Sequence, residues 1–162
     1  MQKERIYVFI DSQNLHHSIL LQDWEVDYKK LYILLKKKYR ASKVFYFIGY
    51  TKKNIRLYER LSSYGYTLIY KPTLVVYKNG KRTMKGNVDG ELILQVMIEY
   101  KNYTKAIIIS GDGDYLCVIK YLQEKNKLEK IIVPNIKCYS SLLRPYAYKI
   151  VDIELHRRDI ER

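Results

Sequence analysis

Short runs of β-branched and aromatic residues recur along this chain, and segments with the spacing of amphipathic helices lie between most of them. The strand-like runs cover residues 6–10, 43–48, 66–70, 106–110, 129–133 and 148–152. Helical spacing is present over residues 26–35, 55–61 and 88–96. Apolar strands that alternate with helices are typical of a parallel sheet covered on both faces, with right-handed crossovers. The pattern therefore predicts an α/β fold with a mostly parallel central sheet.

Residues 73–84 break this alternation. Residues 74–77 read as a strand that runs toward Asn79-Gly80, a dipeptide typical of tight hairpin turns. The predicted hairpin is a basic arm, and its cations would contact phosphate groups without selecting a sequence. Solvated surface charge is the equally weighted alternative for each cation. The candidate nucleic-acid contacts are Lys78, Lys81, Arg82 and the neighbouring Lys85.

Acidic residues directly follow two of the predicted strands. Asp11 ends the first run, and Asp112 and Asp114, separated by one glycine, follow the run over residues 106–110. In open parallel sheets, ligands bind beyond the carboxyl ends of the strands. We therefore expect these acids to share one site, together with Asp89 at the start of a predicted helix.

Four converging carboxylates suit a hard divalent cation such as Mg²⁺ or Mn²⁺, because these ions take oxygen ligands. Without a cation, mutual repulsion raises the proton affinity of some of the carboxylates, so a bound metal should stabilise the fold. A metal held in this way can lower the pKa of a bound water and direct it at a phosphodiester. This chemistry needs neither a histidine nor a serine nucleophile.

Each polar neighbour of these acids has two interpretations. Asn14 either caps the first helix or reaches a metal-bound water or a phosphate. Ser110 either contacts the same groups or closes the turn. Gly111 and Gly113 are expected to let the chain turn sharply at the strand end. The histidines are expected to be surface or helix residues rather than ligands: His16, His17 and, in a charged tail, His156.

The length of 162 residues predicts a single domain, residues 1–162. The net charge of +13 favours polyanions, and nucleic acid more than a membrane, because the apolar runs are short and no basic amphipathic helix with a wide apolar face is present. An AT-rich genome is an alternative source of the many Lys, Ile, Tyr and Asn residues.

The cellular compartment and the cysteines are predicted from local sequence. The N-terminal residues lack the long apolar segment of a signal peptide, so we place the protein in the cytoplasm. Cys117 and Cys138 are far apart in apolar surroundings, which predicts reduced thiols buried in the core.

Three segments together resemble the NYN domain, a branch of the PIN-like nuclease superfamily. They are Ile10-Asp11-Ser12-Gln13-Asn14-Leu15, Lys85-Gly86-Asn87-Val88-Asp89 and Ser110-Gly111-Asp112-Gly113-Asp114-Tyr115. The resemblance implies a Rossmann-like three-layer α/β/α sandwich and metal-dependent cleavage of RNA, single-stranded or structured. It also implies that Asn14 and Ser110 position the metal ligands or the scissile phosphate, the ligands being Asp11, Asp89, Asp112 and Asp114. Whether the protein forms a homo-oligomer is left open.

One departure from the family pattern concerns the helix after Asp89. Many members carry a further acid there, and Gln95 stands at the aligned position. Glu91 is only two residues from Asp89, so on a helix it points to a different side. The departure keeps a second hypothesis open, in which a PIN-like fold binds RNA or assembles with a partner without turnover.

Two other enzyme classes fit the sequence less well. The Toprim domain of topoisomerases and primases would use Asp112 and Asp114, but it requires a glutamate where Asp11 stands. Haloacid-dehalogenase-like phosphatases require a second aspartate two positions after the first, where this chain has Gln13.

Overall fold

The β-branched and aromatic runs form a six-stranded sheet in the computed structural model, which describes residues 3–85 and 87–162. The strand order is β3-β2-β1-β6-β7-β8, and every pair of neighbours in it is parallel. The strands are β1 (Ile6–Asp11), β2 (Ala41–Tyr50), β3 (Thr67–Pro72), β6 (Lys105–Ile109), β7 (Leu128–Val133) and β8 (Ile150–Asp152). The predicted parallel sheet is therefore confirmed.

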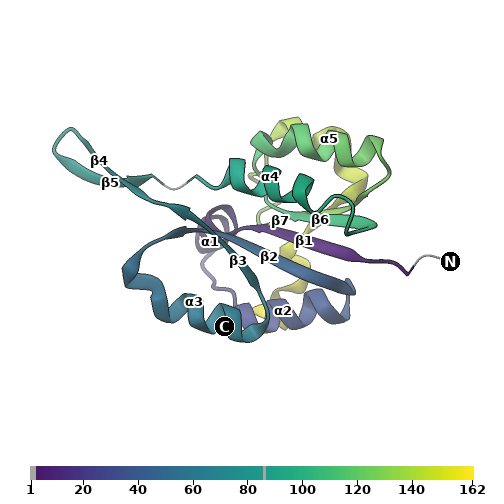
Figure 1. Ribbon diagram of the computed structural model, residues 1–162, viewed down its shortest axis with the longest axis horizontal. Helices are drawn as coiled ribbons and strands as arrows, with labels where there is room; N and C mark the ends of the chain where they lie inside the picture. Colours follow the sequence, from purple (N-terminus) through teal and green to yellow (C-terminus); the bar gives the residue numbers. More distant parts are fainter. Residues whose placement is uncertain (1–2, 86) are drawn as a thin grey trace.

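Helices cover both faces of this sheet (Figure 1). One layer contains α1 (Ser12–Leu20), α2 (Tyr28–Lys37) and α3 (Ile55–Tyr64), with the short α6 (Arg157–Ile160) packed against α2. The other layer contains α4 (Asp89–Ile98) and α5 (Leu116–Glu124). Shorter 3-10 turns are η1 (Lys52–Asn54), η2 (Gly113–Tyr115), η3 (Ser141–Lys149) and η4 (Ile153–His156). This arrangement is the three-layer α/β/α sandwich that the resemblance implied.

Alternation along the strands divides the apolar core between the two layers. Val8 and Ile10 of β1 join the cluster that includes residues of α1, α2 and α3. Phe9, between them, joins the cluster that includes residues of α4 and α5. Successive strand residues point to opposite faces, so a central strand that is apolar throughout fills both cores.

An antiparallel hairpin, β4 (Leu74–Lys78) and β5 (Lys81–Lys85), projects from the body of the protein (Figure 1). Its two turn residues both have positive φ angles, 52° at Asn79 and 73° at Gly80. Positive φ at both positions is the geometry of a type I′ turn, which matches the twist of a two-residue hairpin. The hairpin begins directly after β3 and leads back to α4, so its base lies at the carboxyl edge of the sheet.

Two predictions about the core are wrong. Cys117 and Cys138 are free thiols, but both are exposed rather than buried. His156 is buried instead of lying in an exposed tail, and its Nε2 atom is 2.9 Å from the Tyr39 hydroxyl. In both cases the apolar or charged character of neighbouring residues was a poor guide, because burial depends on which side of a turn or helix faces the sheet. None of the helices in the described ranges has the length and apolar character needed to span a membrane.

Candidate metal centre

Three aspartates from distant parts of the chain meet at the carboxyl edge of the sheet. Asp11 ends β1, Asp112 follows β6, and Asp89 begins α4. One carboxylate oxygen of each lies within 4.8 Å of the other two. Because β1 and β6 are adjacent parallel strands, their carboxyl ends are neighbours, and α4 starts beside them. We call Asp11, Asp89 and Asp112 the carboxylate cluster.

Asp11 is the most buried member of the carboxylate cluster, with 4% of its surface exposed. Its Oδ1 atom accepts a hydrogen bond of 3.2 Å from the backbone N–H of Asn14, so Asp11 is the N-cap of α1. Burial raises the pKa of Asp11, and repulsion by Asp89 and Asp112 adds to the effect. The hydrogen bonds from Asn14 and Tyr115 oppose this rise in pKa. Asp11 is therefore a carboxylate whose negative charge is poorly compensated by the protein.

The hydroxyl of Tyr115 lies between two members of the cluster. It is 3.0 Å from Oδ2 of Asp11 and 2.8 Å from Oδ1 of Asp89. Burial, followed by the charge of Asp11, raises the pKa of Tyr115 far above its usual value, so the phenol keeps its proton. A phenol has one hydrogen to donate, and here two carboxylates compete for it. A cation would supply the positive charge that this single hydrogen cannot.

Asp89 is oriented by the residue two positions before it. The Asn87 side chain accepts from the backbone N–H of Asp89 at 3.0 Å and donates to Asp89 Oδ2 at 2.8 Å. Asp89 also occupies the first turn of α4, where the helix dipole favours negative charge. These contacts hold Asp89 with one oxygen toward Asn87 and the other toward Tyr115.

Asp114 lies at the exposed rim of the carboxylate cluster. Its backbone N–H donates to Oδ1 of Asp112 at 2.9 Å, which makes Asp112 the N-cap of η2. A hydrogen bond shared with the Asp89 carboxyl group raises the pKa of Asp114, and repulsion by Asp112 and Asp89 adds to it. Asp114 thus neighbours Asp89 but is outside the set of three oxygens that lie within 4.8 Å of one another.

The side chains of Asn14 and Ser110 join the loops of the site. The Asn14 amide oxygen accepts a hydrogen bond of 2.9 Å from the backbone N–H of Gly111. It therefore ties α1 to the turn after β6 instead of capping the helix, which Asp11 does. The Ser110 hydroxyl accepts from the backbone N–H of Asp112 at 3.1 Å and lies 3.5 Å from Oδ2 of Asp11. Of its two predicted roles, Ser110 is thus seen to close the turn.

The two glycines of the turn are required by space rather than by backbone angle. Neither Gly111 nor Gly113 has a positive φ. A Cβ atom at Gly113 would collide with Oγ of Ser140, and one at Gly111 would lie 3.1 Å from Cβ of Tyr139. The loop before η3 packs against the turn, so lack of room for a side chain, and not a backbone conformation reserved for glycine, accounts for these two residues.

The other predicted residues lie apart from the carboxylate cluster. Gln95 contacts Oε1 of Glu99 at 3.3 Å, and it is six positions along α4 from Asp89, which corresponds to about 9 Å of helix rise. Glu91 lies 3.4 Å from Nζ of Lys71 on β3. The predicted phosphate contacts on the hairpin that the structure describes are exposed, namely Lys78, Lys81 and Arg82. The backbone of Lys85 ends β5, but its side chain and all of Gly86 lie outside the described part of the chain.

Sequence reasoning assigned no role to Tyr115, although it stands at the end of the Ser110–Tyr115 segment. The signal available in the sequence was a hydroxyl-bearing aromatic residue directly after two strand-end aspartates. Its side chain is fully buried and donates toward Asp11, 104 positions earlier in the chain, a partner that no local pattern in the sequence specifies.

The carboxylate cluster has the donor set of a site for a hard divalent cation. It offers carboxylate oxygens from three residues, one of them buried, and no histidine or cysteine belongs to it. The competition of two carboxylates for one phenol hydrogen shows that negative charge is in excess. Mg²⁺ and Mn²⁺ both fit this donor chemistry, and the residues do not discriminate between them.

Comparison with known proteins agrees with the resemblance seen in the sequence. The sequence model of the family described as the NYN domain matches residues 5–153. A crystal structure of a protein of unknown function from Vibrio parahaemolyticus has a TM-score of 0.77 and 22% identity, with 100% of both chains covered, and shares the fold.

Weaker structural similarity is found to the T5 5′-exonuclease. The structure with bound divalent metal ions (zinc) has a TM-score of 0.48 and 15% identity, over 80% of this chain and 55% of that one. A mutant of the exonuclease has the same TM-score, with 16% identity. No match was found among curated proteins.

Proposed function

Because this chain belongs to the NYN domain family, we propose that it is a metal-dependent ribonuclease of the PIN-like kind, which hydrolyses RNA phosphodiester bonds. The observation that carries this proposal is the approach of the Asp11, Asp89 and Asp112 carboxylates to within 4.8 Å of one another. Isolated acids on a surface would have no such arrangement. The cluster also lies beyond the carboxyl ends of the strands, where α/β sheets bind their ligands.

The residues at the carboxylate cluster would have different roles in binding an ion. Asp11, Asp89 and Asp112 would hold the Mg²⁺ or Mn²⁺, which when bound supplies an acidified water and stabilises charge on the leaving oxygen. The Tyr115 hydroxyl fixes the relative positions of Asp11 and Asp89 and stays protonated throughout. Asp114, at the exposed rim, is placed to accept a proton or to orient a water on the solvent side.

The net charge of +13 supports RNA as the partner, because a basic surface concentrates polyanions. The hairpin rises from the same edge of the sheet as the carboxylate cluster, and its five-residue strands extend about 16 Å. Its exposed cations would therefore contact phosphates several nucleotides from the scissile bond. They would add affinity without base selectivity.

The proposal is tested by incubating the purified protein with labelled single-stranded and duplex RNA, in Mn²⁺ or in EDTA. We expect cleavage in Mn²⁺ only, and a loss of at least about 100-fold in Asp112→Asn, because the variant removes a ligand charge. Asp23→Asn is the matched control. Asp23 is exposed and has a φ of 59°, a conformation that asparagine tolerates. Equal cleavage by the two variants, or cleavage that persists in EDTA, contradicts the proposal.

A second function, RNA binding without turnover, is favoured by one observation. Gln95 occupies the place where many family members carry an acid, and its side chain contacts Glu99. In the described part of the chain, three carboxylates share the tight cluster, and position 95 supplies no further acid near it. Salt-sensitive RNA binding without any metal-dependent cleavage would support this alternative.

A further inference from the structure

A cavity lies beside the carboxylate cluster, on the other face of the sheet. It has a volume of about 560 Å³ and is lined by residues of α1, α2, α3 and β2. Asp11 is paired in register with Phe47, and Ile10 with Tyr46, so Asp11 and Tyr46 point to opposite faces. Ser12, the residue after Asp11, lines the cavity. One step of the backbone therefore separates the cluster from this pocket.

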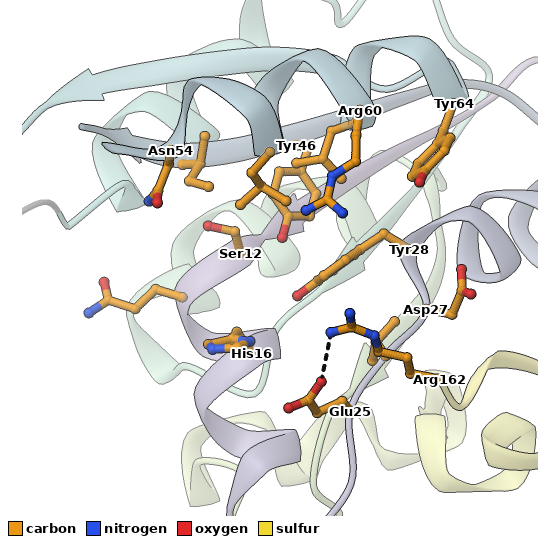
Figure 2. Close-up of a pocket in the computed structure, with 15 residues that line it drawn as sticks. Ser12, His16, Glu25, Asp27, Tyr28, Tyr46, Asn54, Arg60, Tyr64 and Arg162 are labelled. Carbon is orange, nitrogen blue, oxygen red and sulfur yellow. Dashed lines mark hydrogen bonds and ion pairs between the residues drawn. The ribbon is translucent and has the colours of Figure 1, made fainter. Parts of the chain in front are cut away.

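One part of the pocket wall is aromatic and apolar, and the rest is polar. Tyr28, Tyr46 and Tyr64 line it together with Ile48 and Leu57. The Tyr28 and Tyr46 rings meet edge to face at 5.7 Å, and only 2% of Tyr46 is exposed. Figure 2 shows the Arg60 side chain reaching from α3 toward Tyr28, with the hydroxyl of Tyr46 directed into the space between the helices. A flat ring entering this space would meet aromatic surface and a guanidinium group.

Polar groups in the pocket are available to a ligand. Within the described residues, the guanidinium of the exposed Arg60 has no ion pair or hydrogen bond, and the buried Ser12 hydroxyl has no hydrogen bond either. Unused polar groups at the edge of an apolar cavity are what fixes the orientation of a bound small ring.

The charges of the pocket are balanced, unlike those of the whole chain. Arg60 and Arg162 stand against Glu25 and Asp27, and Arg162 is already paired with Glu25 at 3.1 Å. The chain as a whole carries +13. A pocket for phosphate would be expected to concentrate positive charge, so this one is suited to an uncharged heteroaromatic ring with polar edges.

We infer that this pocket binds one unpaired nucleobase of the RNA strand whose backbone lies at the carboxylate cluster. The inference rests on the proposed function, because it names the substrate as RNA that is single-stranded, or locally opened, beside the scissile phosphate. The base lies between Tyr28 and Arg60, and its polar edge faces the hydroxyls of Ser12 and Tyr46. Stacking of this kind accepts any base, because every base has a π-face.

The test measures binding of short fluorescent RNA oligonucleotides in EDTA, so that no strand is cut. Each oligonucleotide of the series carries one abasic nucleotide, and its position moves by one along the strand from each oligonucleotide to the next. The protein variants are Arg60→Ala and the matched control Arg56→Ala. Both arginines are exposed on α3, one turn apart, and Arg56 does not line the pocket. Both variants remove one positive charge from the same helix.

We expect one abasic position to weaken binding to the unmodified protein by about 5- to 100-fold, the range for loss of one stacked base. Arg60→Ala should weaken binding of intact RNA. For the oligonucleotide that is abasic at the sensitive position, the same variant should reduce affinity further by less than about twofold, since the two changes remove the same contact. Arg56→Ala should have the same small effect on every oligonucleotide. Duplex RNA should not distinguish Arg60→Ala from Arg56→Ala.

Four results would overturn the inference. They are equal penalties for the two arginine variants, no sensitive abasic position, free nucleoside monophosphate binding as tightly as the oligonucleotide, and no measurable RNA binding at low salt. Because the assay needs no metal, it stays separate from the proposed activity. Coupling between Arg60 and one base without Mn²⁺-dependent cleavage would support the base-binding pocket and refute the nuclease activity. Mn²⁺-dependent cleavage without such coupling would support the nuclease activity and refute the base-binding pocket.

Discussion

Replacing Tyr115 by phenylalanine removes the one hydroxyl that lies between Asp11 and Asp89, at 3.0 Å and 2.8 Å. Hydrogen bonds to charged groups contribute about 1.5–3 kcal/mol to stability. Two carboxylates share a single hydrogen here, so this range applies once and is not doubled. For a protein of 162 residues, each kcal/mol shifts Tm by about 2–4 °C, so Tyr115→Phe should lower Tm in EDTA by about 3–12 °C.

Divalent metal should reduce the difference in Tm between the unmodified protein and Tyr115→Phe, because a cation neutralises the same carboxylates that the phenol bridges. At a concentration 100 times Kd, a ligand of the folded state adds about 2.7 kcal/mol of stability. Thermal unfolding of both proteins, followed by circular dichroism in EDTA and in Mn²⁺, measures the two effects. We expect Mn²⁺ to raise Tm in both, and by more in Tyr115→Phe.

The control is Tyr103→Phe, another buried tyrosine whose hydroxyl donates to the neutral carbonyl of Val96 at 2.9 Å. Loss of a hydrogen bond between neutral groups costs about 0.5–1.5 kcal/mol. The same loss should be seen in EDTA and in Mn²⁺, because this bond is not part of the cluster. Two results would refute the reasoning. One is that Tyr115→Phe is as stable as the unmodified protein in EDTA, and the other is that its loss of Tm is the same in EDTA and in Mn²⁺, as expected for Tyr103→Phe.

Three further predictions concern stability and binding. Burial, with the charge of Lys38, lowers the pKa of His156, so below about pH 6.5 the unfolded chain binds more protons than the folded protein and stability falls as pH falls. His156→Gln should therefore reduce the change in the urea midpoint of unfolding between about pH 7 and 5.5. Gly113→Ala should lower the free energy of unfolding in urea by about 1–3 kcal/mol, because the added Cβ atom would collide with Oγ of Ser140. Gly90→Ala, where a Cβ atom would have no neighbour within 4 Å, should be neutral or slightly stabilising. Removing three exposed cations of the hairpin should leave Tm unchanged and make RNA binding less dependent on salt, with a log–log slope smaller by about 2; an unchanged slope would show that the hairpin does not contact phosphate. The hairpin variant is the triple alanine replacement of Lys78, Lys81 and Arg82.

The strands and the meeting of Asp11 with Asp112 could be predicted from sequence because both follow from one rule. Apolar runs separated by helices form a parallel sheet, and residues that end adjacent parallel strands lie at the same edge. Asp89 is different, since it begins a helix and no strand end places it. The family resemblance indicated its role, and the structure shows it beside the other two aspartates.

The contacts that complete the site could not be predicted in this way, because they depend on how two loops pack. Asn14 had two local interpretations, and its observed partner, the Gly111 N–H, is 97 positions away. Gly113 was explained by backbone freedom, whereas the actual reason is the loop that carries Ser140. Local sequence constrains the turn or cap that a residue itself forms. It contains no information on how much space a distant loop leaves for that residue's side chain.

The alternation of β1 explains why a site with excess negative charge and a pocket with balanced charges can lie so close together. Asp11 points to the layer of α4 and α5, and Ser12 begins the opposite layer. The sheet between them keeps the excess negative charge of the cluster apart from the aromatic pocket. An RNA strand that crosses the end of β1 would therefore meet both in succession, with its phosphate at the cluster and a base beyond it. The same geometry requires the base to be unpaired, because a paired base could not leave its helix to enter a cavity below the strand end.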